Sequence, residues 1–230
     1  MIKIRVFRAI DDIESCQKYL EGHVRVLKVY GITMITSAKT DWFSNPNVYV
    51  ISAESEDGSK IYGGARVQIA DEGFPLPIQE ALNGKDDFIH DLVRNLIPKG
   101  TAELCGLWNS REVAGYGLGS SYLVRVGVAI SSFLKLETLF GLCAPTTVSN
   151  SEKVGFLVEK RLGDNGLFYY PKEDLIATAV LLCDVNELST ADPIERERIL
   201  ELRNNPIHTT IETGIKATFE LSYNLKIKRI

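Results

Sequence analysis

Metal-ligating side chains are scarce in this sequence. Its 230 residues include three histidines and four cysteines, and the cysteines (Cys16, Cys105, Cys143 and Cys183) form no C-x-x-C pair. A structural zinc site needs soft ligands clustered at short spacing, so we expect no metal. Dispersed cysteines on apolar segments are typical of reduced core thiols, which favours a protein of the cytoplasm.

The sequence also lacks a strong excess of one charge and lacks long apolar runs. Lys and Arg number 26 against 30 Asp and Glu, a formal net charge of -4. A nucleic-acid-binding module usually carries a basic excess, so we expect no nucleic acid as partner. The longest largely apolar stretches, 126–134 and 175–183, are too short to span a bilayer, and the N-terminus does not resemble a signal peptide. We therefore expect no transmembrane segment.

Hydrophobic periodicity predicts alternating strands and helices. Period-two and β-branched runs predict strands at 1–7, 48–53, 61–70, 101–108, 138–143, 156–160 and 175–183. Helical spacing or charge predicts helices at 13–27, 78–82, 86–96, 120–136, 149–154 and 193–203. This order predicts an α/β (α+β) fold with a mixed central sheet flanked by helices. We expect one domain over 1–186, with 187–230 as a C-terminal helical extension packed on it, although 209–230 has no clear period.

The most informative segment is a glycine-rich loop between the strand at 101–108 and the helix at 120–136. Gly115, Gly117 and Gly119 precede Ser120 and Ser121. A helix N-terminus has unpaired N–H groups and partial positive charge, and glycine lets an anion approach the backbone closely. The loop is a candidate phosphate site, and the alternative is a tight turn with no ligand.

Two well-known glycine patterns do not fit this loop. In the dinucleotide pattern G-x-G-x-x-G, the third glycine would fall at Ser120. The Walker pattern requires Gly-Lys-Ser/Thr, and there is no lysine between Lys99 and Lys135. These mismatches remove the main support for a dehydrogenase, a kinase or an NTPase.

A third pattern fits. The stretch W-N-S-R-E-V-A-G-Y-G-L-G-S-S-Y-L resembles the acyl-CoA-binding segment of GNAT acyltransferases, in which a strand runs into R-x-x-G-x-G/A and a helix. Gly117 and Gly119 match the two glycines, while Ala114 stands at the Arg/Gln position. Further along, S-E-K-V-G-F resembles the family's Y-E-K-x-G-F. There Ser151 replaces a tyrosine that, in the family, commonly protonates the leaving thiolate.

The strand sequence A-E-L-C-G-L is similar to the E-L-S-R stretch of acyl-homoserine lactone synthases and of long-chain N-acyl amino acid synthases. Glu103 and Leu104 match, whereas Cys105 and Gly106 stand for Ser and Arg. The resemblance implies a GNAT-like sheet and an N-acyltransferase. Its donor would be an acyl thioester, above all a fatty acyl one, of CoA or acyl carrier protein. A small amine or amino acid would attack this thioester directly, and a homodimer stays open.

Glu103 is the candidate general base. It lies in an otherwise apolar strand, where desolvation would raise its pKa; the alternative is a place on the solvated side of that strand. Cys105 has the same strand parity and so faces the same way. Cys105, Asn150 and Tyr169 are candidates to protonate the thiolate or to line the cleft, and Tyr170 is a second candidate proton donor. Each of them has a purely structural alternative.

The candidate donor-binding residues share a place at the end of the strand, in the glycine loop or at the start of the next helix. They are Leu107, Trp108, Asn109, Arg111, Gly115, Gly117, Leu118, Gly119, Ser120 and Ser121. Trp108 could instead pack in the core, and the two serines could cap the helix. Arg125 is expected to be a solvated helix residue. The alternative functions are a non-catalytic GNAT-fold protein that binds acyl thioesters or regulates, and an unrelated α/β scaffold.

Overall fold

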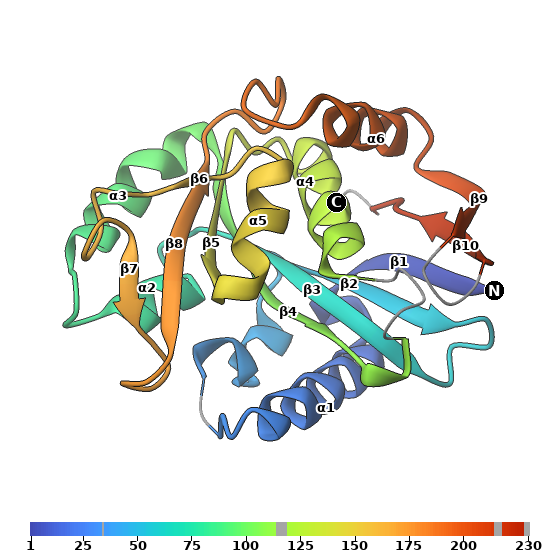
Figure 1. The fold of residues 1–230 in the computed structure, drawn as a ribbon, viewed down its shortest axis with the longest axis horizontal. Helices are drawn as coiled ribbons and strands as arrows, with labels where there is room; N and C mark the ends of the chain where they lie inside the picture. The colour runs from blue at the N-terminus through green and yellow to red at the C-terminus, as the bar shows by residue number, and fades with distance from the viewer. Residues whose placement is uncertain (34, 114–118, 214–217, 228–230) are drawn as a thin grey trace.

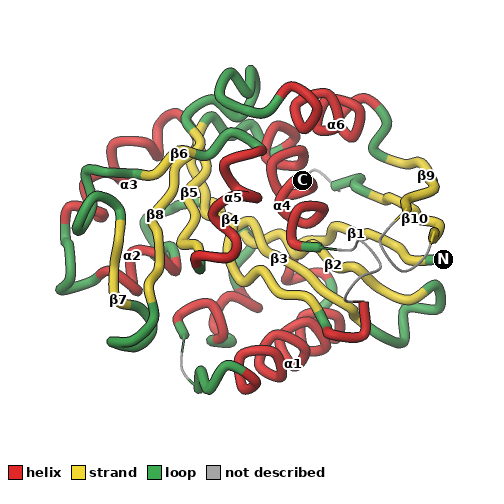
Figure 2. The backbone as a smooth tube through the Cα atoms, viewed as in Figure 1, coloured by secondary structure: helices red, strands yellow, loops and turns green. Residues whose placement is uncertain are grey.

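Ten strands form one mixed sheet in the part of the chain that the computed structural model describes, residues 1–33, 35–113, 119–213 and 218–227. Their order is β6-β8-β5-β4-β3-β2-β1-β10-β9, and β7 pairs with β8 beside this path. Helices lie on both sides of the sheet (Figure 1, Figure 2). This architecture confirms the predicted mixed central sheet with flanking helices.

The strands are β1 (Ile2–Arg8), β2 (Val48–Ser55), β3 (Ile61–Ile69), β4 (Thr101–Asn109), β5 (Thr138–Cys143), β6 (Leu157–Val158), β7 (Leu167–Tyr169), β8 (Ile176–Leu182), β9 (Ile207–Thr213) and β10 (Thr218–Asn224). The helices are α1 (Ile13–Val29), α2 (Pro77–Leu82), α3 (Phe88–Leu96), α4 (Ser120–Phe133), α5 (Pro145–Lys153) and α6 (Pro193–Asn204). Strands β1 to β4 are antiparallel neighbours, whereas β4 runs parallel to β5 and β1 runs parallel to β10.

Some element bounds differ from the prediction. The helix expected at 149–154 already begins at Pro145, because proline fits the first turn of a helix, where its missing N–H is not needed. The strand expected at 156–160 is reduced to Leu157–Val158, and β7 has no counterpart in the prediction. These differences fall on short segments, where hydrophobic periodicity carries little signal.

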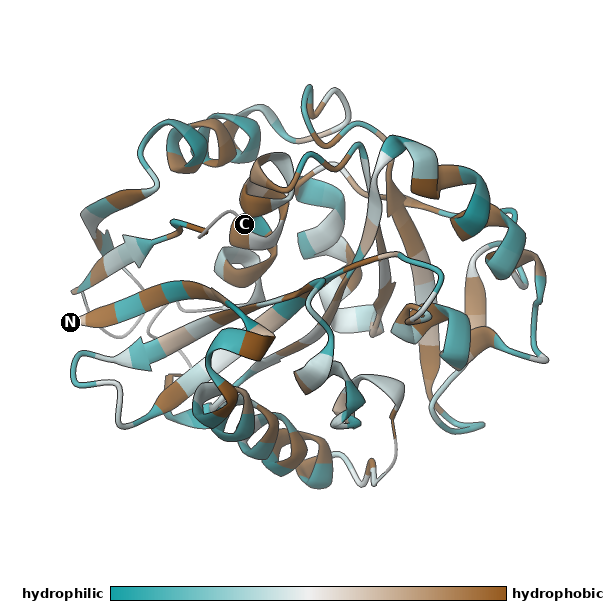
Figure 3. Ribbon diagram, turned by 180° about the vertical axis from the view of Figure 1, so that it is seen from behind, coloured by the Kyte–Doolittle hydropathy of each residue, from teal (hydrophilic) through white to brown (hydrophobic). Residues whose placement is uncertain are grey.

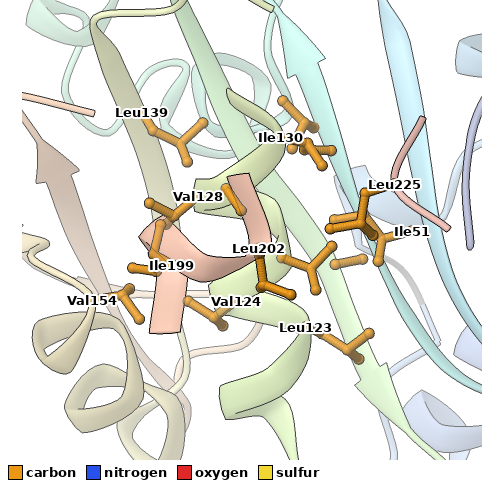
Figure 4. Close-up of a cluster of buried hydrophobic side chains, with 14 of the residues drawn as sticks. Ile51, Leu123, Val124, Val128, Ile130, Leu139, Val154, Ile199, Leu202 and Leu225 are labelled. Carbon is orange, nitrogen blue, oxygen red and sulfur yellow. The ribbon is translucent and has the colours of Figure 1, made fainter. Parts of the chain in front are cut away.

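The two faces of the sheet are buried under different helices. On β5, Leu139 packs into the cluster formed with α4 and α6, whereas its neighbour Phe140 packs into the cluster formed with α2 and α3. Figure 4 shows Val124 and Val128 of α4 in the first cluster, close to Ile199 of α6. Helix α1 covers a third cluster and shows alternating hydrophobic and hydrophilic bands (Figure 3). No helix in the described part of the chain is both long and apolar enough to cross a membrane.

The C-terminal extension is only partly helical. Helix α6 lies where a helix is expected, but residues 207–213 and 218–224 are strands that pair antiparallel with each other. Strand β10 then pairs with β1, from Ile2↔Leu221 to Arg5↔Asn224, so the extension continues the central sheet. Exposed and half-buried residues alternate along β9, as expected of a strand with one covered face.

Two carboxylates of the extension bind to α4. Glu195 of α6 forms a bidentate pair with Arg125, with Nε–Oε2 at 2.7 Å and Nη2–Oε1 at 2.9 Å. Glu212 of β9 accepts a hydrogen bond of 2.7 Å from the Tyr122 hydroxyl. The side chain of Arg125 is only 5% exposed, so the expectation of a solvated Arg125 is wrong. The prediction failed because α6 covers this face of α4, which a helical pattern alone does not reveal.

We predict that Arg125→Met lowers the free energy of unfolding by about 3 kcal/mol, because Glu195 is left nearly buried with only Arg198 beside it. Urea titrations measure this loss. The matched control is Arg94→Met, which removes a pair with Asp91 whose side chains are 72% and 61% exposed, and should cost less than about 1 kcal/mol. Equal losses in the two variants would contradict a structural role for the Arg125 pair.

Candidate active site

Strands β4 and β5 are parallel neighbours that separate partway along their length. Within these two fully described strands, they pair only from Thr101↔Thr138 to Glu103↔Phe140. Beyond this point β4 continues along β3 and β5 continues along β8, so the two strands diverge (Figure 1). Backbone groups on the inner edges of the diverging strands have lost their strand partner and can bind an extended ligand instead.

A bulge at Gly106 shapes β4 beyond the point of separation. The register with β3 shifts between Gly64 and Arg66, and Gly106 has a φ of 59°, a conformation that favours glycine. The Tyr19 hydroxyl of α1 donates a hydrogen bond to the carbonyl of Gly106. After the bulge, Leu107 packs with the α4 cluster and Trp108 with the α1 cluster.

Glu103 lies at the last residue pair before the strands separate. It is 2% exposed, so it is not on a solvated face of β4. Its Oε2 accepts a hydrogen bond of 2.7 Å from the backbone N–H of Ile78, at the start of α2. Burial raises the pKa of Glu103 to about 8, while the Ile78 hydrogen bond and the charge of Arg66 act in the opposite direction. This carboxyl group can therefore exchange a proton near neutral pH.

Arg66 of β3 faces the same side and was missed by sequence reasoning. In the β3–β4 register Arg66 pairs with Cys105, and Gln68 pairs with Glu103. The guanidinium lies over the Trp42 ring at 4.2 Å, and its Nη2 is 3.5 Å from the Cys105 Sγ. The available signal was a single arginine inside the predicted strand IYGGARVQIA, where it shares one face of the strand with Gln68.

The candidate proton donors differ in position. Cys105 is 6% exposed, and burial raises the pKa of its thiol to about 11, so it lines the site as a neutral thiol. Tyr169 is 65% exposed. Tyr170 is instead half-buried, and its hydroxyl accepts a hydrogen bond of 2.9 Å from the N–H of Thr36, whose Oγ1 bonds to the carbonyl of Pro77. Of the two tyrosines, Tyr170 is therefore the one beside α2.

The start of α4 brings together four of the expected residues, Gly119, Ser120, Ser121 and Asn150. Gly119 precedes the first turn, and Ser120 and Ser121 begin it without a side-chain cap. The Asn150 side chain of α5 donates a hydrogen bond of 2.7 Å to the Ser120 Oγ. Nearby, the Oγ of Ser151, the residue in the tyrosine position of the resemblance, lies 3.3 Å from the Sγ of Cys143. Gly115, Gly117 and Leu118 lie outside the described residues.

The remaining candidates for the donor site follow the bulge. Trp108 is 4% exposed and packs under α1, with its ring 6.1 Å from that of Tyr19, which is the core position that the sequence left open. Asn109 is half-buried at the end of β4, and Arg111 is exposed just beyond it. The structure thus groups Glu103 and Cys105 on the face of the sheet that α1 and α2 cover. It groups Ser120, Ser121 and Asn150 between α4 and α5. Among the described residues, no cluster of three or more His, Cys, Asp and Glu side chains is placed to hold a metal.

Solved structures share this fold, whereas no family model and no curated protein matches the sequence. FeeM, an N-acyl amino acid synthase from uncultured soil microbes, matches with a TM-score of 0.62 at 13% identity, over 86% of this chain and 98% of FeeM. BjaI, a CoA-dependent acyl-homoserine lactone synthase solved with SAM and isopentyl-CoA, has a TM-score of 0.53 at 11% identity over 86% of this chain and 89% of its own. The AHL synthase LasI has a TM-score of 0.54 at 14% identity, over 81% of this chain and 91% of LasI.

These likenesses establish the fold. The chain has the fold of GNAT-like N-acyltransferases, which confirms the fold implied by the resemblance of the glycine-loop and E-K-x-G-F segments. Within that fold, its structural neighbours include the branch of N-acyl amino acid and acyl-homoserine lactone synthases that the strand around Glu103 resembles.

We predict that Glu103 makes stability depend on pH. Its pKa is about 8 in the folded protein against an ordinary value of 4.5, so the folded state holds the proton more tightly than the unfolded chain. The resulting stabilisation is complete below the unfolded pKa and is lost as the pH rises toward 8, by up to about 1.4 kcal/mol per pH unit. Urea titrations of wild type and Glu103→Gln from pH 5 to 9 measure it. Parallel curves for the two proteins would show that Glu103 does not titrate in this way.

Proposed function

We propose that this protein is an N-acyltransferase of the cytoplasm that moves an acyl group from a thioester to a small amine or amino acid. The observation that carries the proposal is Glu103, a buried carboxyl group at the point where β4 and β5 separate. A general base works best when its pKa lies near the working pH, and burial brings Glu103 into that range.

The donor in this proposal lies between the diverging strands. The N-terminus of α4, with Ser120 and Ser121, supplies N–H groups and partial positive charge for the diphosphate of CoA. The pantetheine arm extends from there between β4 and β5 toward Glu103. Arg111, which is exposed and follows the end of β4, is the positively charged residue among the described donor candidates, and arginine is well suited to bind a phosphate. The CoA-bound structure of BjaI supports a CoA donor, and acyl carrier protein is the alternative carrier.

The apolar cluster beside the site supports a fatty acyl group. Phe140 pairs with Glu103 across β4 and β5 and belongs to a buried cluster formed with α2 and α3. An acyl chain whose carbonyl carbon lies at Glu103 would lie against this cluster, whose helical side is formed by Leu76, Ile78 and Leu82. Burial of each methylene group contributes about 0.8 kcal/mol, which favours longer donors.

The chemistry needs one proton acceptor and good positioning. The amine nitrogen attacks the thioester carbonyl carbon, the C–N bond forms, and the C–S bond breaks. Glu103 takes the proton that the nitrogen loses, and the thiolate leaves with its carrier and takes a proton from water. Holding amine and thioester in reacting geometry can supply roughly 7–11 kcal/mol of the barrier, so few further side chains are required.

A second candidate function is a non-catalytic protein that binds acyl thioesters. It is favoured by Ser151, which stands where the family's tyrosine is expected and whose hydroxyl is already engaged with Cys143 and with the carbonyl of Thr147. Such a protein would bind acyl-CoA without releasing thiol, and its behaviour would not change in Glu103→Gln.

We predict that Glu103→Gln lowers kcat by about 100- to 10,000-fold in a thiol-release assay with acyl-CoAs of several lengths and a panel of amines. The variant keeps the shape of the side chain and an acceptor for the Ile78 N–H but cannot take a proton. In wild type, the pH profile of kcat/KM should contain a rise with an apparent pKa of about 8 in addition to the ionisation of the amine itself, and this rise should be absent in the variant.

The matched control is Glu54→Gln, which changes a buried carboxylate paired with Arg5 and should leave kcat unchanged. Calorimetry of acyl-CoA binding accompanies both variants. Binding without thiol release from any donor and acceptor would favour the non-catalytic alternative. If the protein neither bound acyl-CoA nor released thiol, both candidate functions would be contradicted.

We predict that Arg111→Ala lowers kcat/KM for acyl-CoA about tenfold, because a charge-assisted hydrogen bond to the diphosphate is lost. The same variant should not change kcat/KM for the matching acyl-pantetheine, which has no diphosphate. Arg94→Ala, on the exposed face of α3, is the control for the loss of one positive charge. An equal effect on both donors would place Arg111 outside the diphosphate site.

A further inference from the structure

Arg66 is a buried charge that forms no salt bridge with any described residue. Its side chain is 0% exposed, and its Nε and Nη1 have no hydrogen-bond acceptor there. The contacts it does make are the ring of Trp42 and the thiol of Cys105, both of them neutral. Burial of an unpaired charge is costly, so a guanidinium in this state indicates an anionic ligand.

The unpaired guanidinium lines a small cavity of about 30 Å³. The cavity walls include Thr36, Trp42, Gln68 and Pro77, and two carboxylates, Asp41 and Glu80, of which Glu80 is paired with Lys39. Trp42 contributes another N–H donor without an acceptor, its Nε1. A cavity of this size holds one or two water-sized groups, so the part of a ligand that reaches Arg66 there is a small polar group such as a carboxylate.

The cavity lies next to the candidate base. Gln68 of β3, in the cavity wall, pairs with Glu103 of β4 in the strand register. Arg66, also on β3, pairs with Cys105 of β4. Ile78, whose N–H binds Glu103, directly follows the wall residue Pro77. A positive charge and a proton acceptor are therefore presented on neighbouring strands, one residue pair apart on the same face.

We propose that Arg66 binds the carboxylate of an α-amino acid acceptor, and that the amine of this acceptor then lies at Glu103. This inference rests on the proposed acyl transfer and specifies its acceptor. The planar guanidinium can bind a carboxylate end-on, with the unpaired Nη1 on one oxygen and Nη2, whose present acceptor is only the Cys105 sulfur, on the other. Since amine and carboxylate sit on one carbon in an α-amino acid, two neighbouring strand positions can hold them together. Amines without a carboxylate leave Arg66 unpaired and are poor acceptors.

Acceptor pairs that differ only in the carboxylate test the proposal. Amino acids are compared with their carboxamides in the thiol-release assay, with decanoyl-CoA as donor. Wild type should prefer the acid by about 10- to 100-fold in kcat/KM for the acceptor, the range expected for hydrogen bonds to a charged group. Arg66→Met should reduce this preference to less than threefold, and Arg66→Lys should keep part of it. Arg94→Met is the matched control and should keep the full preference.

A binding measurement separates this proposal from the acyl transfer on which it rests. Calorimetry compares N-decanoyl amino acids with their carboxamides, which requires no turnover. One outcome is that the acid binds more tightly than the carboxamide, that this difference depends on Arg66, and that no thiol is released with any acceptor. This outcome would support the carboxylate site and overturn the proposed acyltransferase activity. Turnover with no preference for the acid in wild type would overturn the carboxylate site and leave the enzyme. If the preference for the acid stayed unchanged in both Arg66→Met and Arg66→Lys, the proposed carboxylate site at Arg66 would also be overturned.

Discussion

The partial pairing of β4 with β5 is the constraint on which the whole site depends. The pairing of Thr101–Glu103 with β5 holds the two strands side by side. The strands separate after Glu103, where this pairing ends. Helix α4 follows β4 in the chain and α5 follows β5, so both helices come after the segment in which the two strands are paired. The Asn150–Ser120 hydrogen bond then joins these helix starts. One change from paired to unpaired backbone thus positions the carboxyl group, the proposed path of the donor arm and the proposed phosphate site.

Burial on the α1–α2 face affects acids and bases in different ways. It raises the pKa of Glu103 and of Cys105, which favours their neutral forms, and it lowers the pKa of His23 to about 4, which favours neutral imidazole. Guanidinium cannot lose its proton under these conditions. Arg66 therefore keeps its positive charge beside Glu103 and Cys105, whose neutral forms burial favours, and this contrast suits an anionic acceptor better than a neutral one.

The parts of the site that follow from local spacing could be predicted from the sequence, whereas those that follow from tertiary contacts could not. The strand at 101–108, the helix that begins at Ser120 and the shared face of Glu103 and Cys105 all depend on periodicity, and the structure has each of them. The importance of Arg66 depends on what surrounds it, which one strand does not encode. The same holds for Arg125, because α6 is distant in sequence, and for β9 and β10, whose partly exposed residues give a weak pattern.

The place of β1 between β2 and β10 has a consequence for the order of folding. Strand β2 is synthesised soon after β1, but β10 comes from the far end of the sequence. During translation one edge of β1 therefore waits without a partner while most of the chain emerges, and an open strand edge is a template for intermolecular pairing. Contacts of such high sequence separation also slow the closing step of folding. Intermolecular pairing through this edge can therefore occur at any time until β10 has been synthesised and has paired with β1.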